Sequence, residues 1–438
     1  MKYIYIFFLS LPFCSHAQEV LTLEKAISIG LENNFQIKID DQFIQIAENS
    51  NTWARAGRVP TIDLRGTFNN NLINDNNPAS FLNGTYYTGN LGANLETNWV
   101  VYNGGRIRIN KEQLNLAVEQ ERLNKETNIN VLLRSIYQQY YEVIFQQEQL
   151  LVLEEVMALS KDRLAYEESK RDFGASNSYN LVQFRSSVLA DSNSLVTQTR
   201  LVERAKQTLY TTLDFDAGVD YVFDERLSIL PEEIDEERLK TAMQEENYTL
   251  RSLQLLATLN QLNTGLAKAA TKPVISVSGS IGFSENGFKF FADNPNTGEP
   301  FEFIFANRYT GSLGASLVYN LYDGGVRGKD VENAQLQEQI DQLSILEAQA
   351  ELNNQLDILV DNYQNQLEVL ALTDRQIQLA SENLSLTEER FKTGQLTSLD
   401  YRNVQNQYLN ASFSKVGAIY ALLVTKSEID FLVGVFGE

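Results

Sequence analysis

Two short stretches carry the residue types best suited to binding chemistry, a pair of glycines with an arginine one or two positions after them. VYNGGRIRIN spans residues 101–110, and VYNLYDGGVRGKD spans residues 318–330. A glycine-rich turn at the start of a helix can cradle phosphate, because its backbone N–H groups point at the ligand. A P-loop also requires Lys followed by Ser or Thr, and neither stretch has that pair. The glycines are therefore predicted to let the backbone bend where a strand becomes a helix, at Gly104, Gly105, Gly324 and Gly325.

The chain has one His and one Cys, and both lie near its start. Residues 1–17 combine a basic start, an apolar run and a small-residue cleavage site, the pattern of a secretory signal peptide. A mature chain without His16 and Cys14 excludes Ser-His-Asp catalysis, His or Cys metal ligation and disulfides. We therefore predict no enzyme, no cofactor and no metal. Lipidation of Cys14 is the alternative to its removal, although the bulky Phe13 before it is atypical of lipoproteins.

The chain is strongly acidic, with 36 Lys and Arg against 57 Asp and Glu and a formal net charge of −21. Nucleic-acid binding relies on a basic face, so no nucleic acid is expected as a partner. The acidic run over 231–237 falls in a predicted connector and is interpreted as solvated surface. With 438 residues, several domains or an elongated molecule are expected instead of one compact core.

A constant offset relates the two halves of the chain. The glycine pair at 104–105 matches the pair at 324–325 (324 − 104 = 220), and the same offset matches Gly174 to Gly394. An offset that holds over such a span indicates two structural repeats with intervening segments of equal length. We predict a first repeat over 18–235 and a second over 236–438.

Long helices make up most of each repeat. Residues 106–173 and 329–393 contain neither Gly nor Pro and carry apolar residues at helical spacing. A shorter helical segment follows each of them, which predicts helical hairpins over 104–213 and 326–432. Helices of this length need coiled-coil partners. The predicted partners are helices over 22–56 and 236–269, with 214–235 as the connector between the repeats.

Four segments alternate with a period of two residues and are predicted to be strands, at 59–70, 91–102, 273–283 and 309–322. In the third of them, Ile275, Val277 and Ile281 alternate with serines, so one face is apolar and the other is small and polar. The segments that join each pair are long and polar. This asymmetry is typical of outer-membrane strands, although a soluble antiparallel sheet shows the same alternation.

A membrane-spanning role would have to use these strands, because no run after the leader approaches the roughly 18 apolar residues that a membrane helix needs. Four strands are too few to close a membrane barrel, since the smallest have about eight. A closed barrel therefore requires several copies of the chain, and we predict a homo-oligomer.

The duplicated halves, the secretory leader and the YNGGR strand-to-helix junction together resemble the TolC-type outer-membrane efflux channels, the outer membrane factor family. The resemblance covers the mature chain. It implies an α+β membrane protein in which long coiled-coil α-helical hairpins form an α-barrel that continues a 12-stranded transmembrane β-barrel, with four antiparallel strands from each chain of a homotrimer. The implied location is the lipid of the cell outer membrane, with the helices extending into the periplasm. The implied partners are a periplasmic adaptor (membrane fusion) protein and an inner-membrane pump.

The family also carries a tip motif at each hairpin turn, a glycine followed by Thr or Ser three positions later and Asp six positions later. The second repeat matches it with Gly394, Thr397 and Asp400. By resemblance the tips contact the adaptor and line the pore entrance, where Asp400 would form an acidic ring that favours cations. Asn403 stands where the family often has a further acidic residue, which weakens that ring.

The first repeat keeps Gly174 but has Asn177 and Asn180 at the other two motif positions. A purely structural interpretation accounts for both tips as well. Glycine ends helices, and Thr, Asp and Asn cap helix starts whether or not a partner binds. Capping and adaptor contact are therefore both open at this point.

The sequence favours the outer-membrane channel of a tripartite efflux or type I secretion system, a passive export duct from the periplasm or an inner-membrane pump to the exterior. The alternative is a secreted or surface structural coiled-coil protein or adhesin without channel activity. That alternative explains the helices but leaves the four alternating strands unexplained.

Overall fold

The structure, a computed structural model, describes residues 19–77, 84–173, 178–214, 221–293 and 297–434. Within these ranges the chain divides into two compact units. The helical unit is drawn from the described residues within 19–41, 123–251 and 347–434, and the sheet unit from those within 42–122 and 252–346. Several helices continue from one unit into the other.

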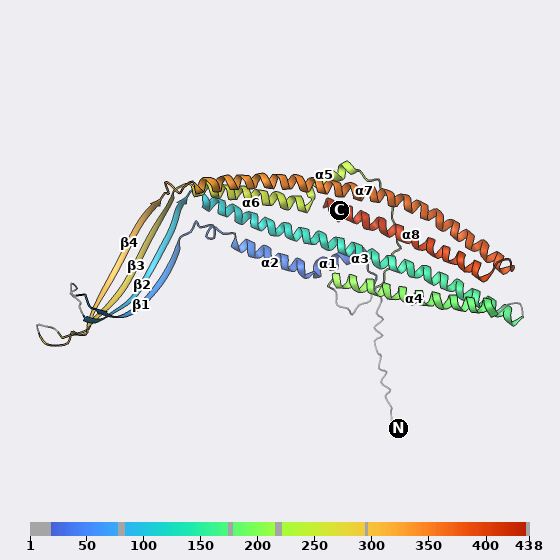
Figure 1. The fold of residues 1–438 in the computed structure, drawn as a ribbon, viewed down its shortest axis with the longest axis horizontal. Coiled ribbons are helices and arrows are strands. Elements are labelled where there is room, and N and C mark those ends of the chain that lie inside the picture. The colour runs from blue at the N-terminus through green and yellow to red at the C-terminus, as the bar shows by residue number, and fades with distance from the viewer. Residues whose placement is uncertain (1–18, 78–83, 174–177, 215–220, 294–296, 435–438) are drawn as a thin grey trace, which may run out of the picture. The chain divides into compact units, whose positions relative to one another are not determined.

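Eight helices and four strands are defined in the described ranges, and Figure 1 labels them in chain order. They are α1 (Leu23–Asn33), α2 (Phe35–Ser50), β1 (Thr61–Asp75), β2 (Gly84–Asn103), α3 (Arg106–Asp172), α4 (Ser178–Thr212), α5 (Glu236–Glu246), α6 (Tyr248–Ala270), β3 (Val274–Phe290), β4 (Ile304–Val318), α7 (Val326–Lys392) and α8 (Ser398–Val433). The long helices α3 and α7 have 67 residues each, which follows from the absence of Gly and Pro in the first and of Pro in the second.

Each of the two shorter partner helices is interrupted once, where the sequence predicted a continuous helix. Asn34 separates α1 from α2, and Asn247 separates α5 from α6. The Asn34 side chain accepts a hydrogen bond from the Ile37 N–H at 3.2 Å, and Asn247 accepts one from the Leu250 N–H at 3.0 Å. Each Asn thus ends one helix and caps the next, a local competition that apolar periodicity does not reveal.

Three apolar clusters hold the helical unit together. The first joins α1, α3 and α4, and it buries Tyr221 and Phe223 of the connector. The second joins α5, α7 and α8, and its fully buried Leu356 and Leu422 each contribute about 1.5–3 kcal/mol. The third lies near the hairpin turns and consists of Phe184, Leu384, Phe391 and Tyr401. Figure 1 shows the ends of α3 and α7 and the starts of α4 and α8 at the same end of this unit.

The sheet unit contains one antiparallel sheet in the order β1-β2-β3-β4. Thr61 of β1 pairs with Asn98 of β2, and Val274 of β3 pairs with Val318 of β4. An offset of 213 relates β1 to β3 (274 − 61 = 213), and the offset of 220 relates β2 to β4 (318 − 98 = 220). The strand pair β1–β2 and the strand pair β3–β4 therefore share one register, which agrees with the duplication inferred from the sequence.

The strands extend farther into the connecting segments than the alternation predicted. Polar residues there still pair, and the Asn90 side-chain amide donates to Asn286 Oδ1 at 2.7 Å. Such cross-strand bonds sustain a ladder in a segment without apolar alternation. At its other end β4 stops at Val318, so Tyr319 and Leu321, which were expected in this strand, lie beyond it.

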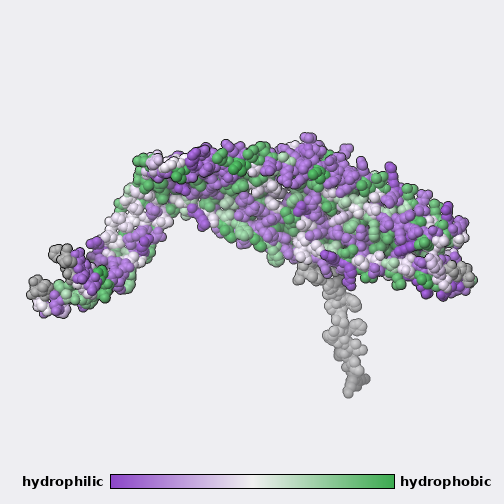
Figure 2. Space-filling view, in the orientation of Figure 1, coloured by the Kyte–Doolittle hydropathy of each residue, from purple (hydrophilic) through white to green (hydrophobic). Residues whose placement is uncertain are grey.

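The two faces of the sheet differ in polarity, as predicted. The register places Leu95 between Leu64 and Ile281, and all three side chains are exposed in the single chain. On the other face, the Arg65 guanidinium lies 3.8 Å from the Glu96 carboxylate. Figure 2 shows pale, near-neutral surface over the part of the strands that joins the helices, where serine hydroxyls pair across β3 and β4. No helix in the described ranges is both long enough and apolar enough to cross a membrane.

Candidate functional site at the hairpin turns

The turn of the second hairpin is built from two helix caps. Gly394 has φ of +77°, the left-handed conformation that ends a helix, and the Gln395 N–H closes the turn on the Arg390 carbonyl at 3.0 Å. Thr397 then caps α8, because its hydroxyl oxygen accepts from the Asp400 N–H at 3.2 Å. An added Cβ at Gly394 would meet open space. The glycine is therefore required by backbone conformation and not by crowding.

Asp400 completes a capping box with Thr397. Its carboxylate accepts from the Thr397 N–H at 3.0 Å and from the Thr397 hydroxyl at 2.6 Å. These hydrogen bonds lower the pKa of Asp400 below its ordinary value, so the carboxylate is charged at neutral pH. Asp400 and Asn403 are both exposed. The turn thus presents a negative charge to solvent from a position fixed by two hydrogen bonds.

The first hairpin turn is described only in part. Gly174 and Asn177 lie outside the described residues. Asn180 is in the first turn of α4, where its Oδ1 accepts from the hydroxyl of Ser398 at 3.2 Å. Ser398 is the first residue of α8 and is buried. A side-chain hydrogen bond therefore joins the starts of α4 and α8, which the sequence had not predicted.

A buried polar network joins the two hairpins about one to two helical turns beyond Ser398. The guanidinium of Arg402 in α8 makes a two-pronged contact with the Asp191 carboxylate of α4, at 2.8 and 2.5 Å. Gln405 donates to Ser160 of α3 at 2.8 Å and to the backbone at Val156. The Asp191 side chain is only 5% exposed. A carboxylate buried this deeply requires its cation, because an unpaired buried charge is strongly destabilising.

A second ion pair lies beside this network, and here the cation comes from the first hairpin and the anion from the second. Arg163 of α3 pairs with Glu388 of α7, and its guanidinium lies over the ring of Tyr401 in α8, 5.2 Å from the ring centre. Hydrogen bonds from Lys392, and then from Arg163, lower the pKa of Glu388. Each hairpin therefore supplies one cation and one anion to the contact between them.

Sequence reasoning missed both ion pairs, although one signal was present. Phe184, Asp191 and Gln198 are spaced by seven residues, and all three are buried. A carboxylate at an inward position of a heptad indicates a buried partner. The sequence does not show which residue is that partner, because Arg402 is 211 positions away from Asp191.

The two strand-to-helix junctions share one backbone conformation. Gly104 and Gly324 both have φ of +73°, and each is followed by a second glycine with positive φ. Asn103 accepts from the Ile107 N–H at 3.2 Å, and Asp323 accepts from the Gly325 N–H at 3.0 Å and the Arg327 N–H at 3.2 Å. Asn103 and Asp323 thus accept hydrogen bonds from the backbone N–H groups that a phosphate ligand would need.

The packing around the two junctions differs. A Cβ on Gly104 would lie 2.4 Å from the Ala269 carbonyl oxygen, whereas a Cβ on Gly324 would meet nothing within 4 Å. In the second junction, the Arg327 guanidinium donates to the carbonyls of Ala270 at 2.9 Å and Asn320 at 3.1 Å. No group of three or more His, Cys, Asp or Glu in the described part of the chain is placed to hold a metal ion.

Comparison with known proteins identifies the fold and the family. The chain matches the family described as outer membrane efflux protein over residues 26–213 and 239–435. Three solved structures have a similar fold: the CmeC outer membrane channel of Campylobacter jejuni, VceC of Vibrio cholerae and the MtrE outer membrane channel of Neisseria gonorrhoeae. Their identities to this chain are 15%, 14% and 16%, with TM-scores of 0.76, 0.72 and 0.73. Each alignment covers 94% of this chain, and 85%, 96% and 89% of the respective relative. No curated protein matches the chain in sequence.

Proposed function

The chain belongs to the outer membrane efflux protein family, and we propose that three copies of it close one export duct. As a member of this family it is an outer-membrane efflux channel and not an enzyme. The efflux assignment replaces the alternative of a structural coiled-coil protein without channel activity. The trimer, the partners and the roles of the turn residues are our proposals.

The proposal of a trimer rests on the unpaired outer edges of the sheet. Within the described residues β1 pairs only with β2 and β4 only with β3, so each outer strand has an unpaired edge 15 residues long. Unpaired edges of that length are a template for pairing with another chain. In a membrane every backbone N–H and C=O group needs a partner, so an open edge requires closure by further strands. Three copies would supply a closed ring of twelve strands.

The duplication specifies how neighbouring copies would pair. Within the chain, Gly92 of β2 lies opposite Ser284 of β3. The equivalent positions are Ser312 in β4 (92 + 220 = 312) and Asn71 in β1 (284 − 213 = 71). If β4 pairs with β1 of the next copy as β2 pairs with β3, Ser312 faces Asn71 across the subunit boundary, on the polar face of the sheet.

Cysteine crosslinking tests this register. We expect a chain with Ser312→Cys and Asn71→Cys, made in a Cys14→Ser background, to form disulfide-linked trimers in outer membranes. The matched control pairs Ser312→Cys with Leu72→Cys, which differs by one residue and places the second thiol on the opposite face. Equal crosslinking by the two pairs, or none by the first, would contradict the register.

We further propose that the duct is passive and water-filled, with energy supplied by an inner-membrane pump that a periplasmic adaptor connects to the hairpin turns. Purified trimers in lipid bilayers should give discrete conductance steps. A non-conducting, monomeric protein that is extracted without detergent would contradict both the duct and the trimer. The family match and the similar fold of solved outer membrane channels support this proposal.

The proposed adaptor contact involves the exposed turn residues around Gly394, Thr397, Asp400 and Asn403, with Gly174, Asn177 and Asn180 at the first turn. Two substitutions separate adaptor contact from capping. Asp400→Asn removes the charge but keeps an acceptor for the Thr397 N–H, whereas Asp400→Ala removes both. If the charge at the pore entrance matters, both variants lose export of a cationic substrate. If only the cap matters, Asp400→Asn exports normally and Asp400→Ala does not.

A further inference from the structure

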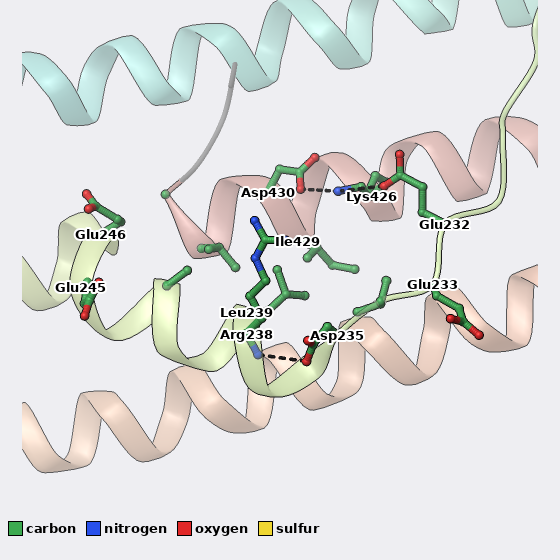
Figure 3. A pocket seen from close by; sticks show the side chains of 14 residues that line it. Glu232, Glu233, Asp235, Arg238, Leu239, Glu245, Glu246, Lys426, Ile429 and Asp430 are labelled. Carbon is green, nitrogen blue, oxygen red and sulfur yellow. Dashed lines mark hydrogen bonds and ion pairs between the residues drawn. The ribbon is translucent and has the colours of Figure 1, made fainter.

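A cavity of about 840 Å³ lies between α5 and the end of α8, entirely within the helical unit. Its walls are Ile234, Leu239 and Ala242 on one side and Ile429 and Val433 on the other. Figure 3 shows Arg238 reaching from α5 toward α8, and the ion pair of Lys426 with Asp430 at one end. We call this cavity the α5–α8 groove. Its apolar walls continue into the second apolar cluster of the unit.

The first repeat has an equivalent groove between α1 and α4, and there it is filled. Its apolar walls include Leu21, Ala26, Leu209 and Leu213, which are buried in the first cluster together with the connector residues Tyr221 and Phe223. The offsets of 213 and 220 match these four wall residues to Ile234, Leu239, Ile429 and Val433 of the α5–α8 groove.

The connector fills the first groove as an extended segment. Val222 forms a parallel bridge with Val20, in which the Leu21 N–H donates to the Val222 carbonyl at 3.0 Å and the Val222 N–H donates to the Glu19 carbonyl at 3.1 Å. The flanking aromatic residues Tyr221 and Phe223 point into the apolar cluster and are 5% and 6% exposed. The ammonium of Lys25 lies 5.4 Å from the centre of the Tyr221 ring.

The α5–α8 groove retains the groups that make these contacts in the first groove. No described segment of the chain occupies it. Ile234 and Glu232 match Leu21 and Glu19, and no described residue pairs with the Ile234 N–H or the Glu232 carbonyl. Arg238 lines the groove and matches Lys25, the residue whose ammonium lies near the Tyr221 ring in the first repeat. Ala242 stands where the first repeat has the larger Ile29, so the second groove offers more room.

The charge of the two grooves differs, and the difference selects the occupant. Six carboxylates line the α5–α8 groove against the two cations Arg238 and Lys426, and they are Glu232, Glu233, Asp235, Glu245, Glu246 and Asp430. The matching positions of the first groove are Glu19, Val20, Thr22, Glu32, Asn33 and Tyr210, only two of which are acidic. A segment entering the second groove therefore needs basic side chains beside its apolar ones.

We propose that the α5–α8 groove docks an extended segment of a partner protein that carries two aromatic residues separated by one residue, flanked by Lys or Arg. The segment adds to residues 232–234 as a parallel strand, with both aromatic rings between α5 and α8. The backbone contacts give the segment its register and the apolar walls provide most of the affinity. This docking does not depend on the conductance of the channel. A failed conductance test would therefore not contradict the docking, and failed peptide binding would not contradict the proposed channel.

Binding of a designed peptide to the purified full-length protein tests the proposal. The probe is the fluorescent peptide Lys-Lys-Tyr-Val-Phe-Lys-Lys, with fluorescence anisotropy as the readout. We expect saturable binding that weakens at least about tenfold when both aromatic residues of the peptide are alanine, or when the lysines are glutamate, since each tenfold corresponds to about 1.4 kcal/mol. Absence of saturable binding by the parent peptide would overturn the proposal.

Variants of the groove locate the binding. Ala242→Trp fills the cavity and should weaken binding at least about tenfold, and Ile234→Pro, which removes the N–H donor, should weaken it several-fold. Because Ala242→Trp can disturb folding, Glu245→Lys provides an independent test on an exposed position that lines the groove. Its matched control is Glu237→Lys, the same charge change on the exposed part of α5 outside the groove.

The two charge variants are expected to differ in their effect on peptide binding. Glu245→Lys should weaken binding several-fold at low salt and less at high salt, while Glu237→Lys should leave it unchanged. Equal effects of the two would overturn the proposal. A photocrosslinker at position 242 identifies the occupant directly: a covalent product with the peptide supports docking, whereas a product of two copies of this chain in the assembled protein assigns the groove to a subunit contact and overturns it.

Discussion

The two repeats have the same elements in the same register, yet equivalent positions carry side chains with different tasks. The first repeat has Asp191 where the second has Ala411, and the second has Arg402 where the first has Val182. Asp191 and Arg402 pair with each other across the hairpins. At both sites the residue of the other repeat is uncharged, so each half supplies only one member of the pair. The duplication thus supplies the backbone, and divergence between its copies supplies the contacts that join them.

Between the two repeats, the backbone conformation is kept at positions where the packing around it differs. The junction glycines Gly104 and Gly324 keep the same positive φ, but only Gly104 is closely covered in the single chain. Similarly, the groove between α1 and α4 and the groove between α5 and α8 have matching walls, but only the first is filled by a described segment. Where one copy has an internal neighbour and the other has none, the second copy is a candidate for contact with another chain.

The largest expected effect comes from replacing Asp191 with the residue of the other repeat. Asp191→Ala leaves the Arg402 guanidinium without its buried partner, and we expect it to lower the free energy of unfolding by about 3–5 kcal/mol. Urea titration in detergent, followed by circular dichroism, measures this. The control is Glu48→Ala in the exposed Glu48–Arg122 pair, whose expected cost is below about 1 kcal/mol.

The double substitution Asp191→Ala with Arg402→Val sharpens the same comparison. It removes both charges, so we expect it to be less destabilising than Asp191→Ala alone. A double variant that is as unstable as the sum of the two single variants would show that the two side chains do not act as a pair.

An intermediate effect is expected at the junction glycines. Alanine in the left-handed conformation costs about 1–2 kcal/mol at either Gly104 or Gly324. Gly104→Ala should cost about 2 kcal/mol more, because its Cβ also meets the Ala269 carbonyl, and a backbone atom cannot be displaced without strain. Unfolding of the single variants in detergent measures the difference, and equal costs in the monomer would contradict it.

The proposed trimer adds a second expectation for Gly324. The offset of 213 matches Ala269 to Ala56 (269 − 213 = 56), so Ala56 of the partner subunit would approach Gly324 as Ala269 approaches Gly104. Gly324→Ala should therefore reduce the fraction of assembled trimer on native gels, in addition to its cost of about 1–2 kcal/mol to the folding of the monomer.

The smallest effect is a local one at the second hairpin turn. The pKa of Asp400 is lowered in the folded chain, so its cap is fully present above the ordinary Asp pKa of about 4 and is lost as pH falls through the lowered pKa. Amide exchange protection in the first turn of α8 should thus stay constant from neutral pH to about pH 5 and then decline in stronger acid. Asp400→Asn should show lower protection without that decline, and the same acid-induced decline in both would contradict the role of Asp400.

Much of the fold follows from local features of the sequence. Apolar alternation located the four strands, the lack of glycine and proline located the long helices, and the offset of 220 led us to infer the duplication. The turn residues Gly394, Thr397 and Asp400 were identified as caps as well as candidate contacts, and the structure places all three in cap geometry. The interruptions at Asn34 and Asn247 were missed, because a polar residue within an amphipathic helix has the same pattern whether it faces solvent or caps a new helix.

The sequence by itself determined the features that depend on residues close together along the chain: element types, the bend at the paired glycines, and the helix caps. Only the tertiary structure decided which strand edges stay free, that Asp191 meets Arg402, and that the connector fills one of two equivalent grooves. Those outcomes depend on distances between residues up to hundreds of positions apart. A periodic pattern states which face of a helix or strand is buried, but the partner on that face is fixed only when the elements pack.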